Sequence, residues 1–361
     1  MIFSASWLVM GTVFLGFWLT SGFDLGVGIV GPWLTRKRKE QNTIFQSIGP
    51  TWEGNQTWLI LGVGGMFAMF PPVYGTFFSL LYGPVMACLF CFILRPAALK
   101  FREKHHRYGL WNIVLFFSSL SSVFLMGALF GTFFQGLPFR WDHLFPVSQG
   151  NPVPFFTVIP ILMGCLTALT MAAYGLAYLS LKMPEPLAQK ARKYYQFGTP
   201  FVGALYIITA WTIYHSVGYQ GAGFIPVFGD CQAQVHHALG AWTHRYAIMP
   251  WLWSFPILSI LALVVAVVGA KARRDLMTVF SHAVAIACML LSAGVCLYPF
   301  LLPSSLAPSH SLTTWNSSSS AYALAVMLTI IAVTLPLVLG YTVWTYWVTR
   351  GRLRHESQKE Y

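Results

Sequence analysis

Two acidic residues lie inside long apolar segments, where a charge is costly and is usually retained for a task. Asp24 occurs within TSGFDLGVG and Glu53 within GPTWEGNQTW, whereas the other acids occur in polar segments or in the C-terminal tail. Burial in an apolar medium disfavours the charged form of a carboxyl group, so a buried acid exchanges protons nearer to neutral pH than an exposed one. The two residues therefore predict a station for proton transfer.

Polar residues follow Glu53 at helical spacing. Gln56 and Thr57 come three and four residues later, so a helix presents them on the face of Glu53, and Asn55 extends the polar strip. This pattern favours a water-accessible path for protons. The alternative is an ion pair that only holds helices together, and Arg95 is the candidate partner for such a pair.

The composition is typical of a chain embedded in lipid. Only 9% of the 361 residues are charged and 56% are hydrophobic, whereas about 25% are charged in soluble domains. A soluble globular fold is therefore excluded. The net charge of +12 does not indicate a nucleic-acid-binding face, because the basic residues occur in short clusters between apolar segments.

Nine apolar segments reach the length of about 20 residues that a membrane-spanning helix needs. They cover about 5–34, 44–70, 73–98, 110–135, 153–181, 196–218, 249–270, 278–302 and 320–347. The sequence therefore predicts an all-α integral membrane protein with a single polytopic domain over residues 1–361. Pro71 and Pro72 predict a tight turn after the second segment, because proline cannot continue a hydrogen-bonded helix.

No Lys or Arg precedes Arg36, so we expect no cleavable signal peptide and a first segment that stays in the mature protein.

Lys and Arg are distributed unevenly between the two sides of the predicted membrane domain. Of the 22 Lys and Arg residues, only Arg140 and Arg245 fall in the breaks after even-numbered segments. Short cytoplasmic loops carry an excess of basic residues. This distribution predicts an N-terminus outside the cell and a C-terminus in the cytoplasm.

Asp24 and Glu53 are expected to lie at similar depth. Each is roughly ten residues from the cytoplasmic end of its segment, which corresponds to about 15 Å at 1.5 Å per residue. Because the two segments are antiparallel neighbours, we expect both carboxyl groups in one buried polar site. Gly22 and Gly26 have small-xxx-small spacing and, with Gly28, predict close helix packing beside Asp24.

Histidines and cysteines show no cofactor-binding pattern. Eight of the ten histidines fall in the breaks or the tail, which leaves His215 and His282 near segment ends. No pair occupies mid-segment positions suited to bind a haem from both sides. The six cysteines lie mostly in apolar segments, where a thiol packs as a small hydrophobic group. We expect no directly bound haem or other cofactor, no metal and no disulfide framework in this chain.

Taken together, the motifs resemble those of subunit II of the cytochrome bd-type quinol oxidases, the subunit without haem. The resemblance covers nearly the whole chain. It rests on SGFDLGVG at 21–28, GPTWEGNQTWLIL at 49–61, LRP at 94–96, and LYPFLLPSS at 297–305 followed by SLTTWNSSSS.

The resemblance implies a fold of two four-helix bundles, about 1–135 and 153–302, plus a peripheral helix at about 320–347. It implies a partner, subunit I, that carries b-type and d-type haems, in the bacterial inner membrane. The complex would oxidise quinol and reduce dioxygen to water with cytoplasmic protons, which generates a proton-motive force without pumping. Small single-span accessory subunits and a structural quinone are compatible with this assignment.

The resemblance also implies roles for individual residues. Asp24 and Glu53 match the acids implicated in proton delivery toward subunit I, and Trp58 matches an aromatic residue near the entrance of an apolar dioxygen path. Family members commonly have Asp where Glu53, Ser21 and Asn316 stand here. Glu53 keeps a carboxyl group, whereas Ser21 and Asn316 do not, so we assign neither of them a proton role.

A proton-coupled secondary transporter is the alternative from another functional class. Transporters also use buried acids and helices interrupted by glycine. The residues alone leave this alternative open.

Overall fold

The computed structural model describes residues 2–104, 108–142, 145–148, 153–221 and 235–353. Its helices are α1 (Ile2–Leu34), α2 (Arg38–Gln46), α3 (Trp52–Met69), α4 (Pro71–Leu80), α5 (Tyr82–Lys104), α6 (Tyr108–Gln135), α7 (Val158–Lys182), α8 (Leu187–Tyr214), α9 (His244–Ile248), α10 (Ser254–Lys271), α11 (Asp275–Leu297) and α12 (Ala321–Val348). Three antiparallel hairpins pair β1 (Phe139–Asp142) with β2 (Phe145–Ser148), β3 (Val217–Gly221) with β4 (Val235–Leu239), and β5 (Phe300–Leu302) with β6 (Leu312–Thr313).

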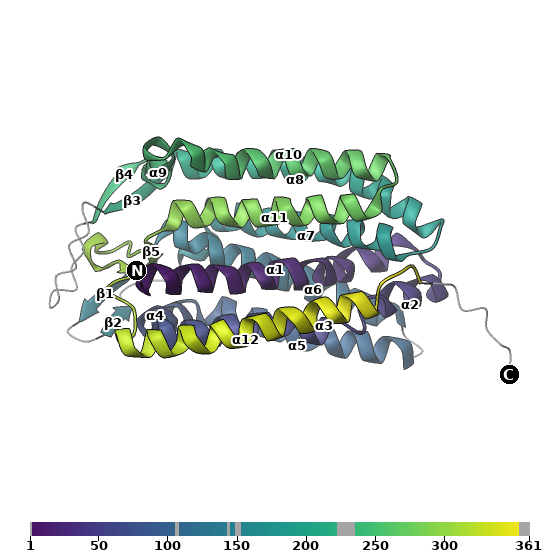
Figure 1. Ribbon diagram of the computed structural model, residues 1–361, viewed down its shortest axis with the longest axis horizontal. Coiled ribbons are helices and arrows are strands. Elements are labelled where there is room, and N and C mark those ends of the chain that lie inside the picture. Colours follow the sequence, from purple (N-terminus) through teal and green to yellow (C-terminus); the bar gives the residue numbers. More distant parts are fainter. Residues whose placement is uncertain (1, 105–107, 143–144, 149–152, 222–234, 354–361) are drawn as a thin grey trace.

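The long helices run side by side along one axis (Figure 1). The three hairpins lie at one end, which we call the hairpin end. The opposite end, which we call the basic end, contains α2 and the segments 35–51, 100–104, 182–190, 271–275 and 349–353. Of the basic residues used to predict orientation, Arg107, Arg354 and Lys359 lie outside the described residues.

Within the described residues, eight helices are long and apolar enough to cross a membrane. They are α1, α5, α6, α7, α8, α10 with the short turn before it, α11 and α12. Helices α3 and α4 meet the criterion only as a pair bent by 118°, which brings the number of candidate spans to nine. The all-α membrane fold predicted from the sequence is confirmed.

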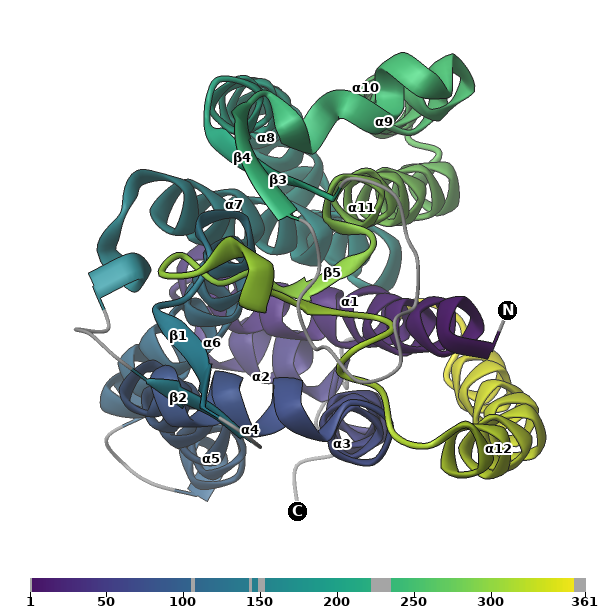
Figure 2. The same ribbon diagram turned by 90° about the vertical axis from the view of Figure 1, so that its left-hand side faces the viewer.

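The second and third predicted segments differ from the structure in their details. The second was expected at 44–70, but α3 begins only at Trp52, because Pro50 interrupts the helix and residues 47–51 form turns. The tight turn predicted at Pro71 and Pro72 is wrong. Both prolines occupy the first turn of α4, where a helix needs no N–H donor. Figure 2 shows α4 lying across the hairpin end, with α3 and α5 seen end-on beside it.

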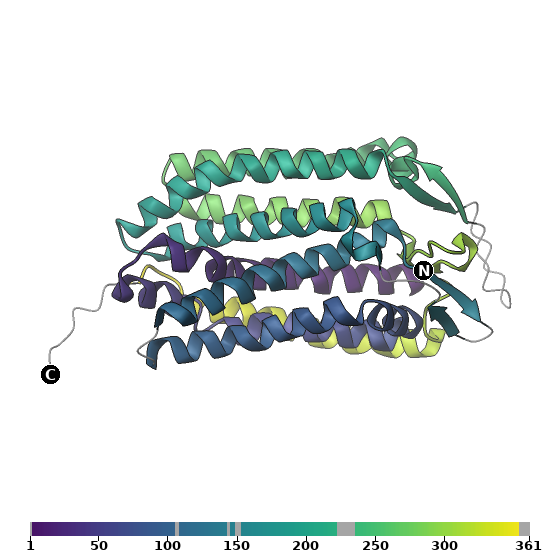
Figure 3. The ribbon, with the colours of Figure 1, turned by 180° about the vertical axis from the view of Figure 1, so that it is seen from behind.

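Helix α1 lies at the centre of the molecule and packs against α3, α6 and α7. Helices α7, α8, α10 and α11 pack on one another, and α5 packs on α6. Seen from behind, the blue α5 and α6 lie beside the teal α7 and α8 (Figure 3). Helix α12 contacts α1 and α3. The division into two four-helix bundles remains a prediction, since α1 and α7 pack closely across the expected boundary.

The glycines beside Asp24 allow this close packing, as their spacing predicted. A Cβ atom at Gly26 would lie 1.9 Å from the backbone oxygen of Met171, and one at Gly175 would lie 2.3 Å from the carbonyl carbon of Gly26. A Cβ at Gly28 would lie 2.1 Å from Ser119 Oγ. The backbones of α1 and α7 are therefore in direct contact next to Asp24.

We expect Gly26→Ala to destabilise the protein, because the added methyl group overlaps the α7 backbone and overpacking costs about 1–3 kcal/mol. The measurement is the midpoint of thermal unfolding in detergent, which should fall by several degrees. Gly11→Ala on the same helix is the control, since a Cβ at Gly11 meets nothing within 4 Å. Equal midpoints for the two variants would contradict the close contact.

Candidate functional site

Asp24 and Arg95 form a completely buried ion pair. Both side chains have 0% exposure, and Arg95 Nη2 donates to Asp24 Oδ1 and, at 3.0 Å, to the backbone oxygen of Asp24. A buried charge persists only when it is paired and hydrogen-bonded. Arg95, named from the sequence as the candidate partner of an ion pair, thus lies against Asp24.

The ion pair leaves many neighbouring polar atoms unsatisfied. Within the described part of the chain, Asp24 Oδ2 and the Nε and Nη1 atoms of Arg95 have no hydrogen-bond partner. The same holds for Ser21 Oγ on α1, Asn55 Nδ2 on α3 and Ser119 Oγ on α6. Buried polar groups that lack protein partners usually bind ordered water. The site therefore has the donors and acceptors needed to hold water beside a carboxyl group.

Glu53 does not share the buried site, so the expectation of two adjacent buried acids is wrong. It is the second residue of α3 rather than ten residues inside a span, and its side chain is 68% exposed. Its carboxylate lies 3.6 Å from the Lys100 ammonium, which is also exposed. The reason is helical geometry, because successive residues turn by about 100°. Asn55, two residues later, points to the opposite side and is 3% exposed, next to Asp24.

The other predicted residues on α3 divide between these two faces. Thr57 is exposed on the face of Glu53, and its hydroxyl donates to the Glu53 backbone oxygen at 3.3 Å. Gln56 is half-buried between the faces, and its Nε2 has no partner among the described residues. Trp58 is buried, and its ring lies against Gly16 of α1.

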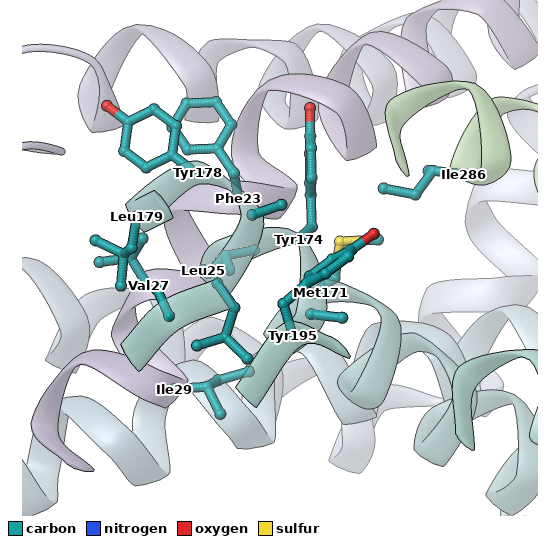
Figure 4. Packing of buried hydrophobic residues seen from close by; sticks show 14 of the residues in the cluster. Phe23, Leu25, Val27, Ile29, Met171, Tyr174, Tyr178, Leu179, Tyr195 and Ile286 are labelled. Carbon is teal, nitrogen blue, oxygen red and sulfur yellow. The ribbon is translucent and has the colours of Figure 1, made fainter. Parts of the chain in front are cut away.

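Aromatic residues enclose the buried acid on the side of α7 and α12. Phe23 stacks on Tyr178 with ring centroids 4.3 Å apart, and Tyr174 lies at its edge (Figure 4). The Tyr178 hydroxyl donates to the Ser47 backbone oxygen at 2.8 Å, and the Tyr346 hydroxyl donates to Asn55 Oδ1 at 2.7 Å. Sequence reasoning did not find these tyrosines, because tyrosine is common in apolar segments. The four serines within residues 118–122 of an apolar segment could have indicated a buried polar position such as Ser119.

A second buried polar network lies between this region and the basic end. Arg102 on α5 donates to Asn112 of α6 and, at 3.2 Å, to Gln41 Oε1 of α2, while Asn112 Nδ2 donates to the same Gln41 oxygen at 2.9 Å. Arg102 is 1% exposed. It follows Arg95 by two helical turns, about 10 Å along the axis of α5. The Arg102 network therefore lies on the basic-end side of the Asp24 site.

Helix α2 is held in place at the basic end by its single acid. The Thr35 hydroxyl donates to Glu40 and holds the pKa of its carboxyl group below the usual range, and Lys37 lies 3.2 Å from the same group. Gln41 Nε2 donates to the backbone oxygen of Thr35 at 2.7 Å. These contacts fix the helix that supplies Gln41 to the Arg102 network.

His282, expected near a segment end, is fully buried among α7, α8 and α11. Its Nδ1 accepts from the Tyr195 hydroxyl at 3.0 Å and its Nε2 donates to the Thr170 backbone oxygen at 3.1 Å. Both ring nitrogens are occupied by protein groups, so this side chain does not fit a haem or metal ligand. Groups of three or more His, Cys, Asp or Glu side chains that could hold a metal do not occur among the described residues.

An apolar cavity of about 960 Å³ lies among α6, α7, α8, α10 and α11. The hydroxyl groups of Tyr206, Tyr246 and Ser292 line one part of it, and Tyr246 is hydrogen-bonded to Ser292 Oγ at 2.8 Å. Apolar and aromatic side chains form the rest of the wall. A long apolar molecule with a small polar group matches this lining.

Comparisons with known proteins agree with the resemblance drawn from the motifs. The chain is 30% identical over 354 residues to the probable cytochrome oxidase subunit 2 of Haemophilus influenzae, which covers 96% of this chain and 94% of that protein. It is 29% identical over 359 residues to subunit 2 of the cytochrome bd-I ubiquinol oxidase of Escherichia coli, with 97% and 95% covered.

A solved structure and a family model extend this similarity. A chain in the bd oxidase structure from Geobacillus thermodenitrificans has the same fold, with a TM-score of 0.72 at 15% identity over 96% of this chain and 98% of that one. The family model described as cytochrome bd terminal oxidase subunit II matches residues 4–349. The chain therefore belongs to the cytochrome bd terminal oxidase subunit II family.

Proposed function

We propose that this chain delivers protons to, and supports, a haem-bearing subunit I in a bd-type quinol oxidase of the bacterial inner membrane. The complex oxidises quinol and reduces dioxygen to water, and this chain is not catalytic alone. The observation that carries the proposal is the buried Asp24–Arg95 pair surrounded by unsatisfied polar atoms. The family assignment supports the oxidase reaction, and the names of the relatives describe such complexes.

In this proposal the basic end faces the cytoplasm, because basic residues are retained on that side of membrane proteins. The N-terminus, at the hairpin end, then lies outside. Protons enter at the basic end beside the Arg102 network and reach Asp24 through water held by its unsatisfied neighbours. The chain has the required polar atoms on four helices, α1, α3, α5 and α6.

Glu53 has a different place in the proposed path. We place subunit I against the Glu53 and Lys100 side of α3 and α5, where both side chains of this ion pair are exposed. Glu53, with Gln56 and Thr57 beside it, is then the station at which protons pass to the partner. Trp58 borders an apolar dioxygen path in the same proposal, supported by the motif resemblance and by its burial against α1.

The haems belong to subunit I in this proposal, where they supply the electron transfer and the reduction of dioxygen. The occupied ring nitrogens of His282 in this chain support that assignment. We further propose that the apolar cavity binds a quinone as a structural ligand. Its volume and the hydroxyls of Tyr206, Tyr246 and Ser292 support this, since they suit an isoprenoid tail and a carbonyl-bearing head.

Affinity purification of the chain from its native membrane should yield a coloured complex with a haem-bearing partner that consumes dioxygen when given quinol. Solvent extraction of the same complex should release quinone. A secondary transporter would instead purify without visible absorbance and move a solute in vesicles. A colourless, solitary and active protein would therefore exclude the oxidase proposal.

Glu53→Gln in the purified complex should slow quinol-driven dioxygen consumption roughly tenfold or more, because the amide keeps the shape but carries no proton. Haem content, measured by absorption, should not change. The matched control is Lys100→Gln, which breaks the same exposed ion pair but keeps the carboxyl group, and should retain nearly full turnover. If Glu53→Gln and Lys100→Gln slow turnover to the same extent, only the ion pair matters and the proton role of Glu53 is wrong.

Asp24→Asn should also slow turnover, but it leaves the buried Arg95 charge unpaired and should reduce complex yield as well. The double variant Asp24→Asn with Arg95→Gln removes both charges and separates the two effects. If the carboxyl group carries protons, the double variant should recover yield while turnover stays low. Recovery of turnover as well would mean that the pair is only structural.

A further inference from the structure

Helix α12 contributes directly to the surroundings of the buried acid, although most of its surface is exposed. Tyr346, near its end, donates a hydrogen bond to Asn55 Oδ1 at 2.7 Å. The Tyr346 ring also packs at the edge of Phe23, with centroids 6.0 Å apart, and Phe23 is the residue before Asp24. A helix distant in sequence therefore reaches the side chain that lies beside Asp24.

The hydrogen bond from Tyr346 determines which end of the Asn55 amide faces Asp24. Asn55 has one acceptor oxygen and one donor nitrogen at the end of its side chain. Because Tyr346 occupies the oxygen, the donor Nδ2 stays available for the neighbouring Asp24, and this nitrogen has no hydrogen-bond partner among the described residues. In this orientation the Asn55 amide offers a hydrogen-bond donor, rather than an acceptor, to the Asp24 carboxylate. Without the tyrosine hydroxyl, either end of the amide can face the acid.

Both ends of α12 are fastened to other parts of the chain. Before its first residue, Ser319 N donates to the Met69 backbone oxygen at 2.9 Å, at the end of α3. After its last residue, Leu353 N donates to the Lys182 backbone oxygen at 2.9 Å, at the end of α7. Arg352 Nη2 donates to Asp275 Oδ2 at 2.8 Å, at the start of α11.

Arg352 contacts a cluster of charged residues in which Asp275 is already paired with Arg192. Arg192 donates to both oxygens of Asp275 at 2.7 Å and to Glu185 at 2.7 Å, and Arg192 and Asp275 are each 5% exposed. Arg352 is 45% exposed and adds a further bond to Asp275. Removal of the Arg352 side chain therefore takes away one contact at the end of α12 and leaves the bonds of the buried Arg192–Asp275 pair in place.

We propose that Tyr346 is a positioning residue for proton transfer through Asp24, and that Arg352 clamps the end of α12 so that Tyr346 stays at its place. Tyr346 acts through Asn55 and does not itself carry the transferred proton. The inference rests on the proposed function of Asp24. It assigns to α12, the helix expected from the sequence to be merely peripheral, a specific part in the buried site.

The test uses the intact complex and measures quinol-driven dioxygen consumption as a function of pH. Tyr346→Phe removes only the hydroxyl and should lower turnover about 2- to 10-fold, the range that one neutral hydrogen bond produces. The pH profile should move toward higher pH, because the Asp24 carboxylate loses an oriented donor. Haem content and complex yield should remain at the wild-type level.

Tyr322→Phe is the matched control, because Tyr322 lies at the other end of α12 and is 81% exposed. It should change neither the rate nor the pH profile. Arg352→Gln should shift the profile in the same direction as Tyr346→Phe by a smaller amount. It keeps the inference testable even if Tyr346→Phe fails to assemble.

The outcomes distinguish this inference from the function on which it rests. If Glu53→Gln and the Asp24–Arg95 double variant slow turnover but Tyr346→Phe and Arg352→Gln behave as wild type, the positioning role is wrong and the proton role stands. Equal changes in Tyr346→Phe and Tyr322→Phe would likewise overturn it. If none of the acid variants slows turnover, the proposed function itself fails.

Discussion

The buried ion pair of Asp24 and Arg95 is the interaction on which the rest of the site depends. Moving both charges out of water costs several kcal/mol for each ion, and close geometry must offset that cost. The backbones of α1 and α7 touch at Gly26 and Gly175, which leaves no space between these two helices next to Asp24. Larger side chains there would separate the helices and open the pair to the membrane.

The pair differs from a purely structural ion pair in what it leaves unsatisfied. A structural pair is expected to satisfy its remaining donors and acceptors with protein groups. Among the described residues, Arg95 uses one of its three side-chain nitrogens, and Asp24 uses one of its two carboxyl oxygens. The polar groups nearby come from four helices. This arrangement combines a fixed charge pair with room for water-mediated hydrogen bonds, which suits a site through which protons pass.

The two acids have separate positions because α3 presents Asn55, and not Glu53, to Asp24 on α1. Asp24 faces the interior, where α3 contributes Asn55 to it. Glu53 faces outward from the first turn of α3, beside Lys100. With Asp24 inside and Glu53 at the surface of neighbouring helices, the proposed proton transfer runs from the interior of this chain toward its surface. In the proposed complex that surface meets subunit I.

The sequence by itself determined the membrane class, the approximate spans and the importance of Asp24, because long apolar segments and a charge within them have few physical explanations. It also identified Arg95 as a candidate partner and the glycines as sites of close packing. It misplaced Glu53, because apolar length shows neither that Pro50 interrupts the helix before α3 nor which face of the helix a residue occupies. Only the tertiary structure brought Tyr346 to Asn55 and Arg352 to Asp275. These contacts join segments far apart in the chain. They depend on how the helices pack, so no local sequence pattern predicts them.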